Sequence, residues 1–407
     1  MKRVVVTGMG IWSCIGQDLQ TVTDSLKQGK SGIIFDPSRI EKGLHCGLIG
    51  NVPKPNIKPL LERRFRVNMP ELAEYAYMAV KEAFTMANIS TDYRSRNEIG
   101  VIFGSGGSMD SVIQADKTLC IENDSLLVGP SAIFQGDTSC VTMNLSTIFG
   151  LRGISMSVAA ACASSNHAIG LGTMYIRMGM QEMVVVGGSM ETSYINAVGE
   201  DAIEALSLRN DDPKGACRPF DKERDGLIPS GGAAALVLEE YEHAIARGAT
   251  ILAEVAGYGF STNGTDTIAA PDADSEYMAM KRALEDAQMR PDQIELINPH
   301  AASTVIGDAI EAKAIERLFS DKPWVSSTKS LTGHEGWAAG ACETVYSILM
   351  MNNNFVAPIA NLTNVDECAK GLRLAHKMER ASIGAFLNHS TGLGGTNSAI
   401  VIKKIDL

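Results

Sequence analysis

An internal repeat constrains this chain more than any other feature of its sequence. Two helical segments match in register and share a tyrosine, a methionine, a lysine and alanines: YMAVKEAFTMANI at 77–89 and YMAMKRALEDAQM at 277–289. A turn and a short β-branched run follow each of them, starting at Ile99 and at Ile294. Glycine turns leading into strands form a second pair, GGAAALVLEE from Gly231 and GGTNSAIVIKK from Gly394. One structural unit is therefore used twice.

The repeat and the continuous apolar strands predict the fold class. Strands such as MVVVGG at 183–188 alternate with amphipathic helices, which indicates largely parallel sheets buried on both faces. We predict an α/β fold in which two duplicated halves, 1–249 and 250–407, form five α-β-α-β-α layers. The alternative, a single dinucleotide-binding fold, would need a glycine at position 13 after TGMG, where Ser13 stands.

Composition excludes several classes of protein. A net charge of -11 argues against nucleic-acid binding, which depends on basic groups meeting phosphates. The eight cysteines include no CxxC pair, so we expect no disulfide framework, no metal site and a reducing cytoplasm. The longest uncharged segment, 153–176, contains serines, an asparagine and a histidine, and no membrane span is expected.

One basic segment stands out in this acidic chain. LERRFR contains Arg63, Arg64 and Arg66. It is either a docking patch for an acidic partner or the solvated start of a helix, and the sequence leaves both open.

Cys162, in VAAACASSNHAIG, is the first candidate for chemistry. A cysteine among alanines is often a buried small hydrophobe. Here, however, GISMSVAA is expected to be a strand and SSNHAIGLGTMYIRMG a helix, so the thiol would lie on the turn between them. The N–H groups and the dipole of a helix start favour the thiolate, and we expect a nucleophile.

Further candidates occupy similar places in the second half. His300 ends an apolar strand and matches Ser105 in the repeat, while His334 precedes a helix much as Cys162 does. Lys329 is either a surface lysine or a positive charge serving the site. The glycine loop TGLGGTN, 391–397, could bring a backbone N–H to an oxyanion. His167, one turn after the cysteine, is interpreted as a packed helix histidine rather than a catalytic one.

Together these segments resemble a known family, the elongating type I and type II β-ketoacyl-acyl carrier protein synthases of the thiolase-like superfamily. The resemblance covers essentially the whole chain and is carried by KRVVVTGMGIWSCIG, the cysteine segment, RPFDKERDG, HAASTVIGD, KSLTGHEGWAAGA and GLGGTN. It implies a cytoplasmic homodimer without a cofactor, whose substrates are carried on the phosphopantetheine of an acyl carrier protein. Arg63, Arg64 and Arg66 would contact that protein.

The resemblance also implies residue roles. Cys162 would take the acyl group, with an oxyanion hole from the N–H groups of Cys162 and Leu393. His300 and His334 would bind the malonyl thioester carbonyl during decarboxylation, and Lys329 and Glu343 would form a supporting charged pair, with Asp308 behind them. Gly107 would line the acyl pocket as in the type I synthases, and Thr304 would contact the pantetheine.

The departures from the family pattern lie around the mouth of the site. Phenylalanines are expected at the positions of Thr391, Leu393 and Leu227, so gating should differ. Ala302 replaces one of two pantetheine-binding threonines, and Trp337 replaces a glycine. His389 replaces an asparagine beside a monovalent-cation site with contributions from Asn298 and Glu343; because imidazole is a poor ligand for an alkali ion, we expect the cation to be missing or displaced.

Two alternatives stay open and a third is disfavoured. The chain could be a specialised synthase of aryl polyenes or resorcinols, or a non-catalytic chain-length partner of another synthase. A degradative thiolase would need a second cysteine near Gly392, where the sequence has none.

Overall fold

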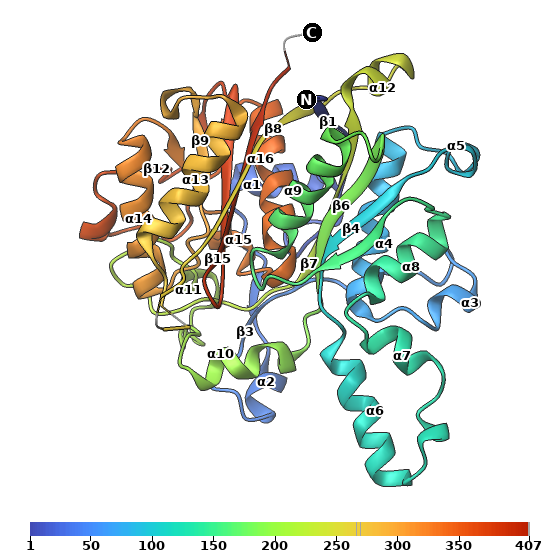
Figure 1. Ribbon diagram of the computed structural model, residues 1–407. Helices are drawn as coiled ribbons and strands as arrows, with labels where there is room; N and C mark the ends of the chain where they lie inside the picture. Colours follow the sequence, from blue (N-terminus) through green and yellow to red (C-terminus); the bar gives the residue numbers. More distant parts are fainter. Residues whose placement is uncertain (266, 269, 406–407) are drawn as a thin grey trace.

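A single large mixed sheet runs through the protein (Figure 1). The computed structural model describes residues 1–265, 267–268 and 270–405. The strands lie in the order β12 (Arg373–Leu374), β10 (Trp324–Val325), β9 (Leu296–Asn298), β14 (Ala385–Gly392), β15 (Thr396–Lys403), β8 (Ala253–Thr262), β1 (Val4–Trp12), β7 (Gly232–Glu240), β6 (Met183–Met190), β4 (Gly100–Gly104) and β5 (Ser155–Val158). Two small sheets pair β2 (Ile33–Phe35) with β3 (Leu48–Gly50) and β11 (Phe355–Val356) with β13 (Glu379–Arg380).

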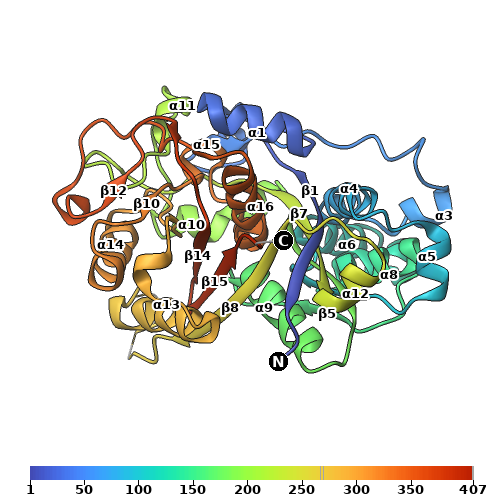
Figure 2. The ribbon, with the colours of Figure 1, turned by 90° about the horizontal axis from the view of Figure 1, so that it is seen from above.

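Helices cover both outer faces and fill the space between the halves, giving the five predicted layers (Figure 2). One outer layer contains α4 (Glu71–Met86), α5 (Thr91–Arg96) and α8 (Cys140–Phe149), and the other contains α13 (Ala273–Ala287) and α14 (Val305–Phe319). The middle layer contains α1 (Leu19–Gln28), α9 (Ser164–Arg177) and α16 (Ala339–Asn352). The shorter helices are α2 (Pro37–Glu41), α3 (Arg63–Arg66), α10 (Val198–Ala202), α11 (Pro213–Ala216), α12 (Tyr241–Ala246) and α15 (Lys329–Thr332).

The prediction of largely parallel sheets is wrong for the centre of the molecule. Strands pair in parallel at both ends of the large sheet, but from β14 through β15, β8, β1 and β7 to β6 every pair is antiparallel. The reason at β14–β15 is local: Gly394 and Gly395, with φ of 93° and 87°, turn the chain back on itself as a hairpin. The halves join where β1 pairs with β8 at Val5 and Val6.

The repeat seen in the sequence is confirmed as a repeat of packing. Gly10 in β1 lies so close to α4 that a Cβ would approach Ala79 O to 2.1 Å, and Gly259 in β8 has the same relation to Ala279 O of α13, also 2.1 Å. Ala79 and Ala279 are the matched alanines of the two helical segments. Glycine and alanine at these positions let helix and strand approach closely in both halves.

The predicted boundary at Ala249 falls between α12 and β8. The middle layer, however, belongs to both halves, because Ile169 of α9 and Val345 of α16 are buried in one hydrophobic cluster. A division into two domains therefore stays a prediction.

An arm projects from this body at the lower right of Figure 1. It consists of α6 (Met109–Glu122), the 3-10 turn η1 (Ser125–Leu127) and α7 (Ser131–Gly136), and none of these three elements has a buried residue. Among the described residues, the arm included, no helix has both the length and the apolar character needed to cross a membrane.

Candidate active site

A cavity of about 620 Å³ brings together the residues singled out in the sequence. Cys162 comes from the turn after β5, His300 from the end of β9, His334 from the segment between α15 and α16, and residues 391–395 from the β14–β15 hairpin. Other lining residues include Glu200, Ile203, Ala205, Leu227, Glu276, Ala302, Thr304, Ile306 and Glu311. Cys162 belongs to the first half of the chain and the other three segments to the second, so the cavity lies where the two halves meet.

A sharp backbone turn presents Cys162 to this cavity. Ala161, just before it, has φ of 47°, a left-handed conformation that costs a residue with a Cβ about 1 to 2 kcal/mol. The Ser164 hydroxyl holds the turn, since it donates to Ala161 O at 2.5 Å and accepts from Ala160 N–H at 2.8 Å. Helix α9 begins immediately afterwards, as the sequence predicted.

At Cys162, burial opposes the thiolate that the start of α9 favours. Burial raises the pKa of its thiol to about 12, and the negative charge of Glu200 adds to that rise. Lys329 and the N–H groups of Leu393 and of Cys162 itself lower the pKa, but by less than burial raises it. The two N–H groups predicted to form the oxyanion hole therefore both act on this sulfur.

The two histidines lie next to each other, with ring centroids 5.1 Å apart and rings nearly perpendicular. Burial, followed by the charge of Lys329, lowers the pKa of His334 to about 3 and that of His300 well below its usual range. Both imidazoles are therefore neutral near pH 7. His300 Nδ1 and both ring nitrogens of His334 have no hydrogen-bond partner within the described chain, so nitrogens are available for a ligand.

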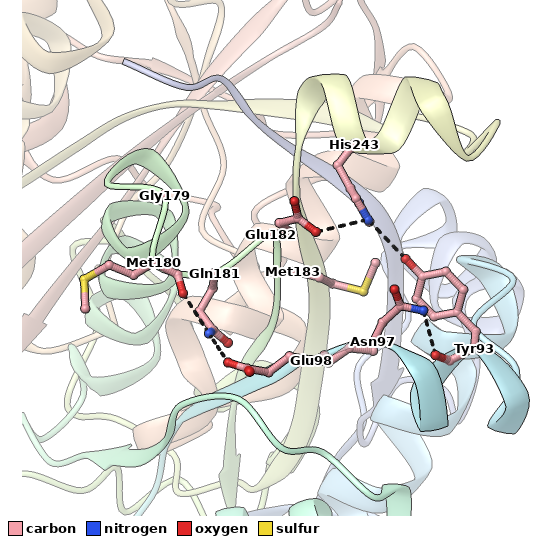
Figure 3. Close-up of a pocket in the computed structure, with 10 residues that line it drawn as sticks. Tyr93, Asn97, Glu98, Gly179, Met180, Gln181, Glu182, Met183 and His243 are labelled. Carbon is pink, nitrogen blue, oxygen red and sulfur yellow. Dashed lines mark hydrogen bonds and ion pairs between the residues drawn. The ribbon is translucent and has the colours of Figure 1, made fainter.

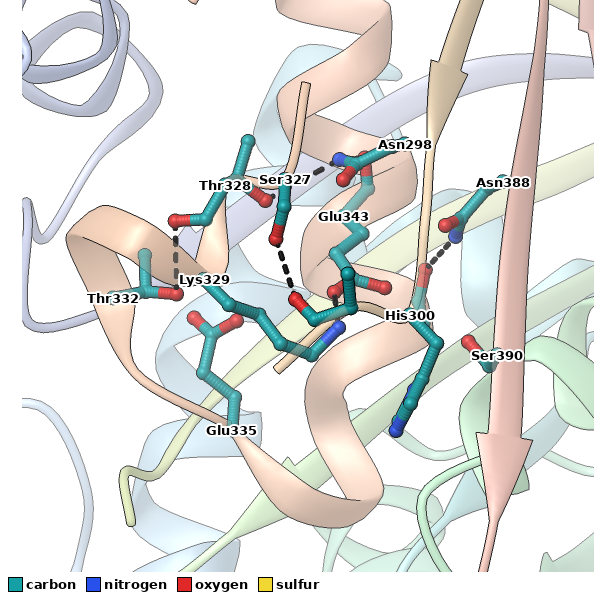
Figure 4. Close-up of polar contacts among 12 residues, drawn as sticks. Asn298, His300, Ser327, Thr328, Lys329, Thr332, Glu335, Glu343, Asn388 and Ser390 are labelled. Atoms are coloured by element: carbon teal, nitrogen blue, oxygen red, sulfur yellow. Dashed lines mark hydrogen bonds and ion pairs between the residues drawn. The ribbon is translucent and has the colours of Figure 1, made fainter. Parts of the chain in front are cut away.

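A buried ion pair lies beside His300 (Figure 4). Lys329 Nζ donates to Glu343 Oε1, and both side chains are fully buried. Glu335 is also buried and adds a second carboxylate near Lys329, whose charge lowers the pKa of Glu335 while burial raises it to about 7. The surface-lysine interpretation of Lys329 is thus wrong.

Asp308 and Glu311 lie one turn apart at the start of α14, and both are buried. Asp308 accepts from Phe220 N–H at 3.0 Å and from Thr304 N–H at 3.1 Å, which holds the RPFDKERDG segment against the histidine loop.

Sequence reasoning missed Glu311. Its carboxylate accepts from the N–H of His300 at 2.7 Å and of Ala301 at 2.6 Å, and Oε1 lies 2.6 Å from His389 Nδ1. It therefore fixes the backbone that carries His300. Its helical spacing from Asp308 in the HAASTVIGDAIE segment was the signal that could have found it.

The mouth of the cavity has both exposed and polar groups. Leu393 is 64% exposed, and Leu227 and Thr304 line the wall. The Thr391 hydroxyl is buried near the Glu276 carboxylate. Behind it lies Glu276, a second carboxylate the sequence did not reveal, whose pKa is raised well above its usual value by burial and by the nearby charge of Glu311.

Two predicted or unusual residues lie away from this cavity. Gly107 is not among its lining residues; a Cβ there would lie 2.0 Å from Gly136 O, so it packs against α7. The Trp337 indole occupies the space beside Gly106, where a Cβ would approach it to 1.7 Å. Packing thus accommodates the large side chain.

His167 is confirmed as a packed helix histidine. Its Nδ1 lies 2.6 Å from the Tyr258 hydroxyl and its Nε2 lies 3.0 Å from Thr396 Oγ1, so both ring nitrogens are occupied.

The predicted cation position combines two oxygens that could coordinate a cation with a histidine that could not. Asn298 Oδ1 and Glu343 Oε2 are buried without a hydrogen-bond partner in the described part of the chain, and such oxygens suit a hard cation. His389 instead turns its Nδ1 to Glu311. The oxygens fit an alkali ion and the imidazole does not, so a missing or displaced cation stays a prediction.

The arginines of the basic segment lie on α3, where Arg63 and Arg64 are exposed and Arg66 Nε donates to Leu61 O at 3.0 Å.

A second cavity, of about 220 Å³, lies between α5, β6 and α12 (Figure 3). Its polar groups largely bond one another, as Gln181 does with Glu98 at 2.8 Å. We therefore do not assign it a reaction.

Comparison with known proteins agrees with this geometry. Residues 1–244 match the family described as beta-ketoacyl synthase, N-terminal domain, and residues 252–363 match its C-terminal domain. The chain belongs to the β-ketoacyl synthase family. A 3-oxoacyl-acyl-carrier-protein synthase 1 from Haemophilus influenzae is 38% identical, with 99% of each chain covered, and that of Escherichia coli is 37% identical over the full length of both.

Solved ketosynthases share the fold. A beta-ketoacyl synthase from Burkholderia phymatum superimposes with a TM-score of 0.93 at 34% identity and full coverage of both chains. A complex of a type II polyketide acyl-carrier protein with its ketosynthase gives 0.88 at 27% identity, again with both chains fully covered. The predicted thiolase-like fold is confirmed.

Proposed function

We propose that this chain is a β-ketoacyl-acyl carrier protein synthase, which joins an enzyme-bound acyl group to a malonyl unit by decarboxylative condensation in fatty acid elongation. The observation that carries the proposal is the convergence of Cys162, His300 and His334 on one cavity beside the Leu393 loop. Full-length relatives named as such synthases support the same reaction.

In the first step Cys162 accepts the acyl group. Its sulfur bonds to the thioester carbon while the bond from that carbon to the pantetheine sulfur breaks, and the thiol proton passes to the departing pantetheine. The N–H groups of Cys162 and Leu393, which already act on this sulfur, stabilise the oxyanion. Because burial raises the pKa of the Cys162 thiol, this proton loss accompanies attack on the thioester.

In the second step a malonyl thioester binds with its carbonyl at His300 and His334. Loss of carbon dioxide leaves an enolate, whose carbon bonds to the acyl carbon while the bond to Cys162 breaks; the sulfur then takes a proton from solvent. Two neutral imidazoles can donate N–H bonds to the enolate oxygen without protonating the carbon nucleophile. Burial, followed by the charge of Lys329, keeps both rings neutral.

Separate variants test the two steps. Cys162→Ala should abolish acylation, seen as loss of the mass shift of the intact protein. His300→Ala should keep acylation but slow carbon dioxide release from malonyl carrier protein about 100- to 1,000-fold, as for loss of an oxyanion donor. His376→Ala, at an exposed histidine, is the matched control and should change neither step. Unchanged condensation in both test variants would rule out the assignment.

We also propose two protein partners, an acyl carrier protein and a second copy of this chain. The exposed arginines of α3 would meet an acidic acyl carrier protein, a protein class that one structural neighbour binds. A second copy of this chain would cover the arm. The non-catalytic partner and the aryl polyene or resorcinol synthase are not favoured by the comparisons, while the absence of a cofactor and the cytoplasmic location stay predictions.

A further inference from the structure

Arg39 on α2 is the least expected buried side chain in the protein. It is 2% exposed, and its Nε and Nη2 have no hydrogen-bond partner among the described residues. A buried donor without an acceptor costs about 1 to 3 kcal/mol, and more when it is charged. A ligand that supplies the acceptor would remove this cost.

The acids around Arg39 are mostly occupied. The oxygens of Asp201 accept from the N–H groups of His45 and Cys46 at 3.0 and 3.1 Å, and Asp36 Oδ1 accepts from Ser38 N–H at 3.0 Å. Glu200 is the remaining carboxylate whose charge acts on Arg39, and no hydrogen bond joins the two side chains in the described chain. Glu200 and Arg39 thus face the same space without filling it.

That space is a small cavity lined by Arg39, Asn196, Glu200 and His334. Its volume of about 20 Å³ holds roughly one water-sized group. Glu191 also lines it, but its carboxylate is occupied by Ser108, Asp110 and Asn196. Glu200 and His334 line the main cavity as well, so these two side chains lie between the two cavities, and Cys162 lines the larger one.

We propose that the small cavity is the far end of the acyl-binding site and binds the hydroxyl group of a hydroxylated acyl chain attached to Cys162. The hydroxyl oxygen accepts from Arg39 and its hydrogen is donated to Glu200. A hydroxyl fits because it both donates and accepts; a carboxylate would satisfy Arg39 but meet Glu200, and a methyl group would leave both unpaired. This inference rests on the proposed function and names its substrate class.

The test compares matched acyl pantetheine thioesters that end in a hydroxyl, a methyl or a carboxylate, over a series of chain lengths. Acylation rates of Cys162 are measured by intact-protein mass spectrometry. At one chain length the wild type should favour the hydroxyl over the methyl about 10- to 100-fold, the range for hydrogen bonds to charged groups. Arg39→Met and Glu200→Leu should each remove most of this preference, while Glu200→Gln, which keeps an accepting oxygen, should retain part of it.

Arg96→Met is the control, because Arg96 is exposed and pairs with Asp92; it should keep the wild-type preference. Equal rates for the hydroxyl and methyl probes at every length in the wild type would overturn this inference and leave the condensation intact. A preference for the carboxylate probe would also overturn it. Failure of every probe to acylate Cys162 would instead contradict the proposed function itself. If Arg39→Met does not fold, Glu200→Leu and Glu200→Gln decide the outcome.

Discussion

At the scale of single residues, burial decides the chemistry of the site. A cysteine at a helix start would be expected to ionise easily, yet loss of water around Cys162 outweighs the N–H groups and Lys329. The same burial keeps His300 and His334 neutral, which suits groups that donate hydrogen bonds to an enolate. One physical cause thus makes the thiol less reactive and the imidazoles more useful.

Alkylation of Cys162 by iodoacetamide tests its state. With a pKa of about 12, the thiolate fraction grows tenfold for each pH unit, so the rate at Cys162 should rise log-linearly from about pH 7 to about pH 10 without a plateau. Glu200→Gln should speed the reaction above about pH 8, because the charge of Glu200 raises this pKa. Peptide mass spectrometry resolves Cys162 from the exposed Cys120. A plateau below about pH 9 at Cys162 would contradict the assigned pKa.

At the scale of secondary-structure elements, both halves repeat one packing contact. A glycine in a strand lies directly against the backbone of an alanine in the helix that covers it. Gly10 against Ala79 and Gly259 against Ala279 leave no room for a methyl group. Both contacts are between backbone and Cβ, so rotation of a side chain cannot relieve them.

Gly10→Ala and Gly259→Ala should therefore each lower the free energy of unfolding by about 1 to 3 kcal/mol. Urea denaturation followed by circular dichroism measures the change. The control is Gly199→Ala in α10, where a Cβ would meet nothing within 4 Å; it should leave stability unchanged or raise it slightly. Equal stability of Gly10→Ala and the control would show that the strand and helix can separate without cost.

At the scale of the whole molecule, the arm built from α6, η1 and α7 carries a group of exposed apolar side chains. It exposes large apolar side chains that a water-exposed segment seldom carries together: Leu119, Ile121, Leu126, Leu127, Ile133 and Phe134. Leu126 is 85% exposed and Ile133 is 70% exposed. A second copy of the chain would cover these groups.

The double variant Leu126→Asp/Ile133→Asp should convert a dimer to a monomer, because a charge buried at an interface without a partner costs several kcal/mol. Light scattering coupled to gel filtration gives the mass directly. Met178→Asp, at an exposed methionine of α9's end, serves as the control and should stay dimeric. A wild-type monomer at micromolar concentration would disprove the proposed homodimer.

Charge reversal on α3 tests whether its arginines bind the acyl carrier protein. Arg63→Glu/Arg64→Glu should lower kcat/KM about tenfold with carrier-bound substrates, with little change for free pantetheine thioesters, because only the carrier has an acidic surface to repel. Added salt should narrow the difference between variant and wild type. An equal loss of kcat/KM for carrier-bound and free substrates would show that the arginines stabilise the fold and do not dock the carrier protein.

The sequence by itself determined the duplicated α/β architecture and the turns that carry Cys162, His300 and His334, because periodicity, glycines and local turn chemistry act over short stretches of chain. Only the tertiary structure decided the antiparallel centre of the sheet, the pairing of Glu311 with the backbone of His300, and the isolation of Arg39 beside Glu200. Those properties depend on which distant segments meet and on how much water they exclude, and neither can be read from local spacing.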